Sequence, residues 1–347
     1  MSLTSDVTEP RMTRLATRSR EVRFASRPNM LHSANLELAQ SEVTPPGEGQ
    51  ILVRNTWMSV DPHVFSRMDD VPTPVRQPFM PGRPLDGGAV GEVVVSKAAG
   101  IPVGATVLHS LGWREYAVVD AAAALVVNAE LAPPQAYLGV LGLPGLTAYA
   151  ALIDVAAIQR ADVVFISGAA SPVGSVAGQI ARKLGASTVI GSAGGPDETL
   201  KVLDASGFDM IIDHNLGSVG IQLGRVAPDG IDVFIDNVGG DLLVAAIDAL
   251  RTGGRAALVD SESSCNARHP VPGPHNLAKV IDKQLTLRGV QVSTYLPTFD
   301  EYIQHAATWF AEGDLRADET TFEGLEQVST ALVASTCSVG TVLVRLS

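Results

Sequence analysis

One stretch near the middle of the chain has the order of a strand, a tight turn, a helix and a second strand. Asp162 to Ser167 is a short run rich in β-branched residues that lacks a helical period, as expected of a strand buried on both faces. Apolar residues recur four positions apart from Val176 to Leu184, which predicts a helix, and Ser187 to Ile190 predicts the second strand. Two strands joined through a helix form a βαβ unit, which belongs to a parallel sheet.

The turn inside this unit, Gly168 to Gly174, consists almost wholly of small residues. Ser171 suits the N-cap of the following helix, and Pro172 suits its first position. Unpaired N–H groups and the helix dipole favour a phosphate at such a helix start. The usual glycine pattern of a dinucleotide site is absent apart from its last glycine, Gly174. A phosphate-binding turn and a crossover that binds nothing therefore both fit these residues.

The length and charge of the chain limit the number of domains and the kinds of partner that we expect. Its 347 residues predict about two domains. The net charge of −12 and the lack of a lysine or arginine stripe argue against nucleic acid or an anionic membrane as the partner. The two cysteines, Cys265 and Cys337, are too few for a disulfide framework, which fits a cytoplasmic protein. Residues 1–20 have no apolar signal segment and predict a mobile tail.

The pattern of predicted elements changes once along the chain. From about residue 21 to residue 130, short strand-like runs alternate with proline and glycine, which predicts a small antiparallel β domain. From about residue 140 onwards, strands alternate with helices, which predicts a doubly wound parallel sheet. The last run, Gly340 to Leu346, is strand-like and is expected to return to the first domain. The predicted fold class is therefore α/β.

Several longer strings carry a resemblance to a known family. They are Ser59–Pro62, Gly139–Tyr149, Ala169–Ala181, Asp236–Gly240 and Glu323–Glu326. With these strings and this order of elements, the chain resembles the medium-chain dehydrogenase/reductase superfamily, within the zinc-independent branch of prostaglandin, curcumin and double-bond reductases. The resemblance implies a GroES-like, β-rich catalytic domain over residues 21–138 and 313–347, and a Rossmann domain over residues 139–312.

The resemblance also implies a reaction. A hydride from NADPH reaches the β-carbon of an α,β-unsaturated carbonyl in a small molecule, and a proton reaches the α-carbon. This chemistry needs a nicotinamide held face-on, a donor to the carbonyl oxygen and exclusion of water. No metal, nucleic acid or membrane is expected. A homodimer is expected, because many members of the family are dimers.

Several residues are expected to contact NADP(H), some through the turn and others through the resemblance. They are Ala170, Ser171, Pro172, Val173, Gly174, Ser192, Gly194, Lys201, Asn237 and Ser338. Ser192 stands where NAD-preferring enzymes have an acidic residue, which favours NADP. The family often has a lysine where this chain has Glu198, whose carboxylate would repel a 2′-phosphate, while Lys201 would compensate in part. Alternatively, Glu198 points into solvent and the backbone amides of residues 192–195 bind the phosphate.

Other departures from the family pattern surround the predicted nicotinamide. Cys265 replaces a tyrosine beside the ribose, and Ser338 replaces an asparagine. His63 replaces a tyrosine that lines the substrate pocket, while Asp260 and Glu262 stand where relatives have glycine and an apolar residue. His63, Asp260, Glu262 and Cys265 are the catalytic candidates. Each also has a plainer interpretation: a surface histidine, carboxylates that cap a turn, and a thiol that packs.

Three functions fit these residues. The first is an NADP(H)-dependent reductase of an activated C=C bond, in which His63 or ordered water donates the proton. The second is a cofactor-independent isomerase, cyclase or lyase with a degraded nicotinamide site, because His63 and a partly buried Asp260 or Glu262 can move protons near neutral pH. The third is a non-catalytic binding protein. It is disfavoured because the departures replace polar groups with other polar groups.

Overall fold

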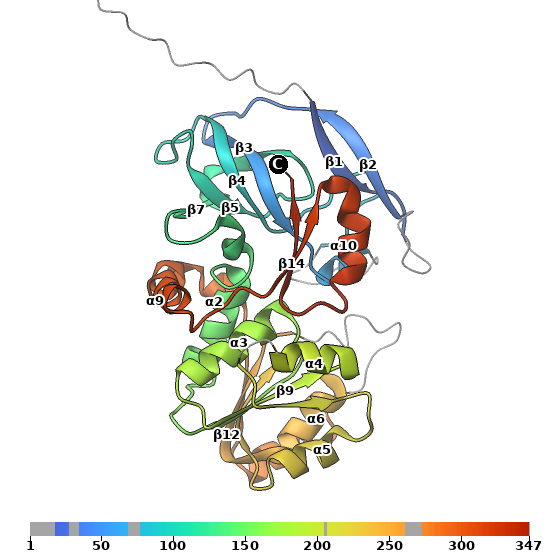
Figure 1. Ribbon diagram of the computed structural model, residues 1–347, viewed down its shortest axis with the longest axis vertical. Coiled ribbons are helices and arrows are strands. Elements are labelled where there is room, and N and C mark those ends of the chain that lie inside the picture. The colour runs from blue at the N-terminus through green and yellow to red at the C-terminus, as the bar shows by residue number, and fades with distance from the viewer. Residues whose placement is uncertain (1–17, 28–34, 69–76, 205–206, 261–272, 347) are drawn as a thin grey trace, which may run out of the picture.

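The computed structural model describes residues 18–27, 35–68, 77–204, 207–260 and 273–346. These residues form two lobes, one built on a mostly antiparallel sheet and the other on a parallel sheet (Figure 1). The predicted α/β fold class, with a β-rich part and a doubly wound part, is confirmed.

The first lobe combines strands from both ends of the chain. Its strands are β1 (Arg18–Phe24), β2 (Leu36–Glu42), β3 (Gln50–Ser59), β4 (Ala89–Ser96), β5 (Thr106–His109), β6 (Tyr116–Asp120), β7 (Leu125–Val126), β14 (Glu319–Glu323) and β15 (Thr341–Arg345). Within the described residues they form a seven-stranded sheet in the order β14-β15-β3-β4-β5-β7, with β6 paired to β3, and a separate β1-β2 pair. The predicted return of the C-terminal strand is confirmed, since β15 pairs with β3. Strand β1 begins at Arg18, inside the predicted tail of residues 1–20.

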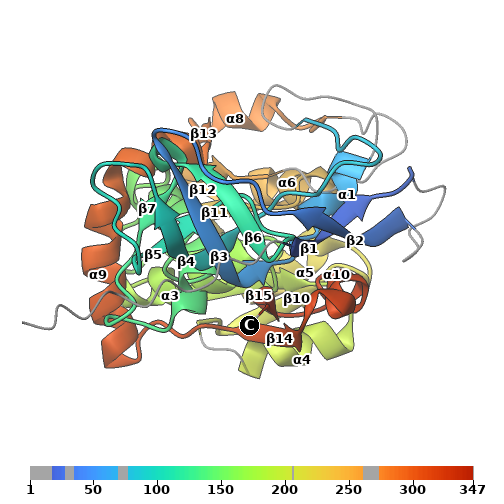
Figure 2. The same cartoon turned by 90° about the horizontal axis from the view of Figure 1, so that it is seen from above.

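The second lobe is a parallel sheet with helices on both faces. Its strands are β8 (Val163–Ile166), β9 (Thr188–Ala193), β10 (Met210–Asp213), β11 (Ile231–Asp236), β12 (Leu250–Leu258) and β13 (Thr286–Gly289). Its helices are α2 (Leu143–Ala150), α3 (Pro172–Lys183), α4 (Pro196–Asp204), α5 (Val219–Val226), α6 (Gly240–Ala249), α8 (Ala278–Asp282) and α9 (Phe299–Glu312). The strand order in the described chain is β10-β9-β8-β11-β12-β13. From above, β13 and α8 lie at one edge of the molecule and α4 at the other (Figure 2).

Strand β8 is buried on both faces, as its sequence predicts. Val164 and Ile166 belong to the hydrophobic core shared with α2 and α3, while Phe165 belongs to the core shared with α5 and α6. Phe165 also stacks on Phe234 of β11, with ring centroids 5.1 Å apart. An apolar run without alternation is what a strand between two helical layers requires.

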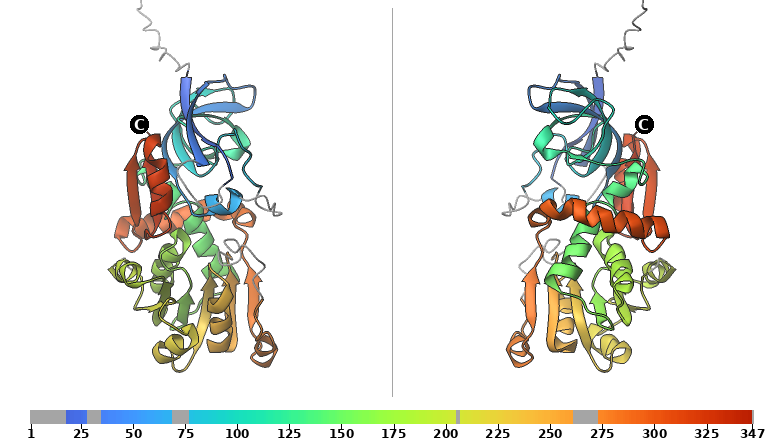
Figure 3. Two further views of the ribbon diagram at one scale, coloured as in Figure 1. Left: turned by 90° about the vertical axis from the view of Figure 1, so that its right-hand side faces the viewer. Right: turned by 90° about the vertical axis from the view of Figure 1, so that its left-hand side faces the viewer.

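The two lobes share a continuous core at their junction. Leu108 and Leu343 of the first lobe lie in the same hydrophobic cluster as α2, α3 and α9. Helix α9 crosses between the lobes (Figure 3), and its buried Tyr302 donates a hydrogen bond to the carbonyl of Val140. The predicted domain boundaries at residues 138 and 312 lie beside this junction and remain predictions.

Two short helices complete the first lobe. Helix α1 (His63–Met68) follows β3 and buries Val64 and Met68, and α10 (Val328–Ala334) packs beside β15. In the part of the chain that the structure describes, every helix is too short or too polar to cross a membrane.

Candidate active site

A cleft of about 660 Å³ lies between the two lobes, with walls from both. The first lobe contributes the end of β3, the start of α1 and the turn before β15, and the second contributes the turn before α3 and the ends of β11 and β12. Most of the predicted site residues that the structure describes line it. They are His63, Ala170, Ser171, Pro172, Val173, Asn237, Asp260 and Ser338.

The turn that opens α3 folds as the sequence predicts. The Ser171 hydroxyl accepts the Gly174 N–H at 3.0 Å, which caps the helix, and Pro172 is the first helical residue. A Cβ on Gly174 would lie 2.1 Å from the carbonyl oxygen of Gly168, so only glycine lets the helix approach the turn this closely. The start of α3 therefore faces the cleft with its dipole, and a pyrophosphate fits there.

Four residues predicted to contact the cofactor do not line the cleft. Gly174 packs against the turn, and Lys201 lies exposed on α4. Ser192 is fully buried, and its hydroxyl accepts the Gly168 N–H at 3.2 Å, so it holds the turn to β9. Gly194 is covered by the side chain of Glu198. Neighbouring groups or their distance along α4 separate these four residues from the cleft, and their contacts with the cofactor stay predictions.

The backbone amides after β9 donate hydrogen bonds to carboxylates of the chain itself. The Gly194 N–H donates to Oε2 of Glu198 at 2.9 Å, and the Gly195 N–H donates to Oδ1 of Asp213 at 3.0 Å. Glu198 lines the cleft together with His214. The interpretation in which Glu198 points into solvent and leaves these amides to a phosphate is therefore wrong.

Two of the catalytic candidates meet across the cleft. Nε2 of His63, the first residue of α1, lies 3.3 Å from Oδ2 of Asp260, which follows β12. The His63 side chain is 54% exposed and that of Asp260 only 15%, so a carboxylate held in the wall orients an imidazole that reaches into the open space. The other two candidates, Glu262 and Cys265, lie outside the described residues.

A second carboxyl group, Asp61, lies beside this pair and is missed by sequence reasoning. It lines the cleft, and Oδ2 accepts a hydrogen bond from the Ser59 hydroxyl at 3.0 Å. Burial raises the pKa of Asp61, and the nearby His63 opposes this rise. In the sequence it lies in the Ser59–Pro62 string that carries the resemblance, two residues before His63. The site thus holds two carboxyl groups, Asp61 and Asp260, and the imidazole of His63.

The end of β11 is fixed by a buried network. Oδ1 of Asp236 accepts the Gly239 N–H at 2.8 Å and the Ser167 hydroxyl at 2.9 Å. The Asn237 side chain donates to the Ser167 carbonyl at 2.7 Å. Burial raises the pKa of Asp236 despite these hydrogen bonds. These contacts fix the backbone where Asn237 meets the cleft.

A backbone hydrogen bond joins the first lobe to the turn before α3. The Gly340 N–H donates to the carbonyl of Ala170 at 2.8 Å. Ser338 reaches the cleft from the same turn before β15. Among the described residues, no group of three or more histidine, cysteine or acidic side chains is arranged to hold a metal ion.

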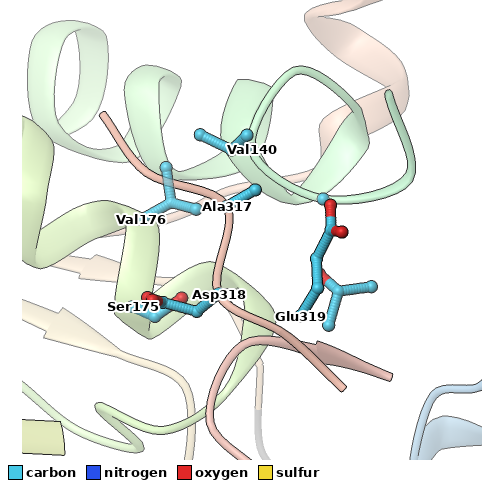
Figure 4. Close-up of a pocket in the computed structure, with 8 residues that line it drawn as sticks. Val140, Ser175, Val176, Ala317, Asp318 and Glu319 are labelled. Carbon is cyan, nitrogen blue, oxygen red and sulfur yellow. The ribbon is translucent and has the colours of Figure 1, made fainter. Parts of the chain in front are cut away.

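A small second cavity of about 10 Å³ lies between residues of α3 and the segment that leads into β14 (Figure 4). Asp318 and Glu319 line it together with residues of α3 and Gly139. Oδ2 of Asp318 is buried and has no hydrogen-bond partner among the described residues. Burial, with a contribution from the charge of Asp318, raises the pKa of Glu319 to about 7. Two carboxyl groups therefore share a poorly solvated corner of the junction.

Comparison with known proteins shows that most of the chain is similar to oxidoreductases. Residues 20–127 match a family model described as the N-terminal domain of oxidoreductase, and residues 172–311 match one described as zinc-binding dehydrogenase. The NADPH-dependent curcumin reductase of Escherichia coli is 33% identical over 318 residues, which cover 89% of this chain and 91% of the relative. Prostaglandin reductase 1 of Rattus norvegicus is 32% identical over 308 residues, 86% of this chain and 90% of the relative.

A solved structure is similar as well. The crystal structure of CurA from Vibrio vulnificus in complex with NADPH superposes with a TM-score of 0.86 at 31% identity, and the match covers 94% of this chain and 99% of CurA. Of the strings that carry the resemblance in the sequence, Ser59–Pro62 and Asp236–Gly240 lie within the regions that the family models match, and Ala169–Ala181 overlaps the second region. The chain therefore belongs to the medium-chain dehydrogenase/reductase superfamily, in the branch of the curcumin and prostaglandin reductases.

Proposed function

We propose that this protein is an NADPH-dependent reductase of a C=C bond conjugated to a carbonyl group in a small molecule. The observation that carries the proposal is a single cleft that contains both the start of α3 and the His63–Asp260 pair. A dinucleotide site and a proton-handling pair thus face the same space. The names of the curcumin and prostaglandin reductases and the NADPH complex of CurA support the same chemistry.

The residues in the second lobe fit the cofactor. The capped start of α3 carries the partial positive charge of the helix dipole, which favours a pyrophosphate. Beside it, the cleft is lined by Ala170, Ser171, Pro172 and Val173. Asn237 and Ser338 reach the same cleft from opposite lobes and would hold the nicotinamide end. Bound NADPH supplies a hydride for the β-carbon of the substrate.

The first lobe contributes the proton. His63 lines the cleft with about half of its side chain exposed, and Asp260, 3.3 Å away, orients the imidazole. The substrate gains a hydride at the β-carbon and a proton at the α-carbon, so one proton per turnover must come from a protein group or from water. His63 is the titratable group placed to give that proton, and Asp61 stands beside it with a raised pKa.

The direct test combines binding and turnover. NADPH should bind the purified protein and raise its unfolding temperature. At an NADPH concentration of a hundred times the dissociation constant, the free energy of unfolding should rise by about 2.7 kcal/mol. Addition of a 2-alkenal or a conjugated enone should then consume NADPH and yield the saturated carbonyl compound. The proposal fails if neither NADPH nor NADH binds, or if NADPH binds and no conjugated carbonyl compound is reduced.

One observation favours the second candidate function, cofactor-independent acid–base chemistry. The His63–Asp260 pair is already assembled in the chain and needs no cofactor to move a proton. Isomerisation of a conjugated enone without any dinucleotide, lost in His63→Ala, would support this candidate.

The assembly and location of the protein are also proposals. We propose a homodimer joined along β13, because β13 pairs with β12 on one side and forms an edge of the described sheet. A cytoplasmic location fits the two cysteines of the chain. Light scattering on the purified protein should give twice the mass of one chain, and a monomeric mass would contradict the dimer.

A further inference from the structure

We propose that Glu198 sets the choice between NADPH and NADH, and that it lets NADH bind about as well as NADPH. This inference rests on the proposed function, because it assumes that a dinucleotide occupies the cleft. It concerns the far end of that cleft from His63, where the adenosine ribose of a dinucleotide bound over α3 would lie beside the ends of β9 and β10.

Glu198 is held in place by the backbone. Its Oε2 accepts the Gly194 N–H at 2.9 Å, which fixes the carboxylate over the end of β9 and in the wall of the cleft. A Cβ on Gly194 would lie 3.2 Å from the same oxygen and 3.1 Å from Nε2 of His214, so both side chains converge over this glycine. The carboxylate is therefore part of the site and not a solvated surface group.

The neighbouring backbone amide, that of Gly195, also donates a hydrogen bond to a carboxylate. Oδ1 of Asp213 accepts the Gly195 N–H at 3.0 Å and the Asn215 N–H at 2.9 Å. Asp213 is only 6% exposed, so its charge cannot turn away into solvent. A 2′-phosphate that sought the amides of Gly194 and Gly195 would thus have to displace two carboxylates.

The other described residues of the cleft offer a 2′-phosphate little compensation. Among the described residues that line the cleft there are three carboxyl groups, Asp61, Glu198 and Asp260, and no lysine or arginine. Lys201 is one turn beyond Glu198, but it does not line the cleft. Phosphate recognition normally relies on such cations, and their place here is taken by a negative charge.

A ribose hydroxyl suits this arrangement better than a phosphate. A carboxylate beside the ribose accepts a hydrogen bond from the 2′-hydroxyl of NADH, which is the usual way in which an acidic residue favours NAD over NADP. In contrast, one pair of like unit charges about 4 Å apart in water weakens binding about fivefold, and a phosphate with nearly two charges weakens it further.

The test is calorimetric titration of NADP⁺ and NAD⁺ into the wild type, Glu198→Gln and Asp197→Asn. Glutamine keeps an oxygen for the Gly194 N–H and removes the charge. Asp197 is exposed, and Asp197→Asn removes the same charge one residue away from Glu198. This variant is therefore the matched control. In Glu198→Gln we expect NADP⁺ to bind roughly 5- to 10-fold more tightly and NAD⁺ severalfold more weakly, with melting temperatures confirming that each variant is folded.

The outcomes separate this inference from the proposed function. Comparable wild-type affinities for NAD⁺ and NADP⁺, shifted towards NADP⁺ by Glu198→Gln but not by Asp197→Asn, would support it. Dinucleotide binding with a ratio that Glu198→Gln leaves unchanged, or that Asp197→Asn shifts equally, would overturn the inference and leave the reductase proposal intact. If the wild type binds neither dinucleotide, both proposals fall.

Discussion

Glu319 should make the stability of this protein fall as the pH rises through neutrality. The residue lies at the junction of the lobes, next to Asp318, and lines the small cavity together with Gly139 and Thr341 (Figure 4). Its ordinary pKa of 4.5 is raised to about 7 in the folded protein, first by burial and then by the charge of Asp318. Folding therefore favours the protonated form.

The sign and the size of the effect follow from this shift. The folded state holds a proton that the unfolded chain has already lost above about pH 4.5, so stability is fully present below that pH and is lost as the pH rises through about 7. The whole shift corresponds to about 3.4 kcal/mol at 1.36 kcal/mol per pKa unit. Because Glu319 is only half-buried, solvent screening should reduce this to about 1–2 kcal/mol.

Urea unfolding of the wild type and Glu319→Gln at about pH 4 and about pH 8 measures the effect. The variant should be about 1–2 kcal/mol more stable than the wild type at the higher pH and nearly equal to it at the lower pH. Glu323→Gln on the same strand is the control, since Glu323 is 71% exposed and lies 3.9 Å from Arg345. If the difference in stability between Glu319→Gln and the wild type is the same at both pH values, the Glu319 carboxyl does not titrate as described.

Two further substitutions test the site. His63→Gln should lower kcat for the saturated product by about 10²–10⁴-fold, as expected for the loss of a general acid, while the affinity for NADPH measured by calorimetry stays the same. An unchanged kcat would show that water or another group supplies the proton. Gly174→Ala should abolish NADPH binding and cost about 1–3 kcal/mol in urea unfolding, because the new Cβ would lie 2.1 Å from the Gly168 carbonyl oxygen. Gly224→Ala on α5, where a Cβ would meet no atom within 4 Å, should instead be neutral or stabilising by up to about 1 kcal/mol. Equal effects of the two glycine substitutions would contradict the close packing at the turn.

The parts of the fold that depend on neighbouring residues were predictable from the sequence. The cap at Ser171 and the helix start at Pro172 are confirmed, because a hydroxyl and a proline act on the backbone within one turn. Strand β8 is confirmed because an apolar run between two helical layers has no polar face. Local chemistry determines both features.

The site depends on contacts between distant residues and was predictable only in part. Departures from the family pattern single out His63 and Asp260 separately, but no local rule brings α1 to the residue after β12. Nor does the residue pattern show that Ser192 turns inward to hold Gly168.

For Glu198, the sequence identifies a charge of the wrong sign and leaves its direction open. In the structure the Glu198 carboxylate accepts the Gly194 N–H, and the side chain of His214 converges on the same glycine. Whether a surface carboxylate bonds a nearby amide or solvent depends on differences of about 1 kcal/mol, which a sequence pattern does not resolve.

The most direct measurement follows the hydride itself. The protein would be given NADPH deuterated at C4 of the nicotinamide together with a 2-alkenal, and the product would be examined by NMR and mass spectrometry. We expect one deuterium atom at the β-carbon of the saturated aldehyde and, in deuterated water with unlabelled NADPH, a label at the α-carbon instead. A saturated aldehyde without deuterium from the cofactor, or an isomerised alkenal formed without consumption of NADPH, would contradict hydride transfer in this cleft.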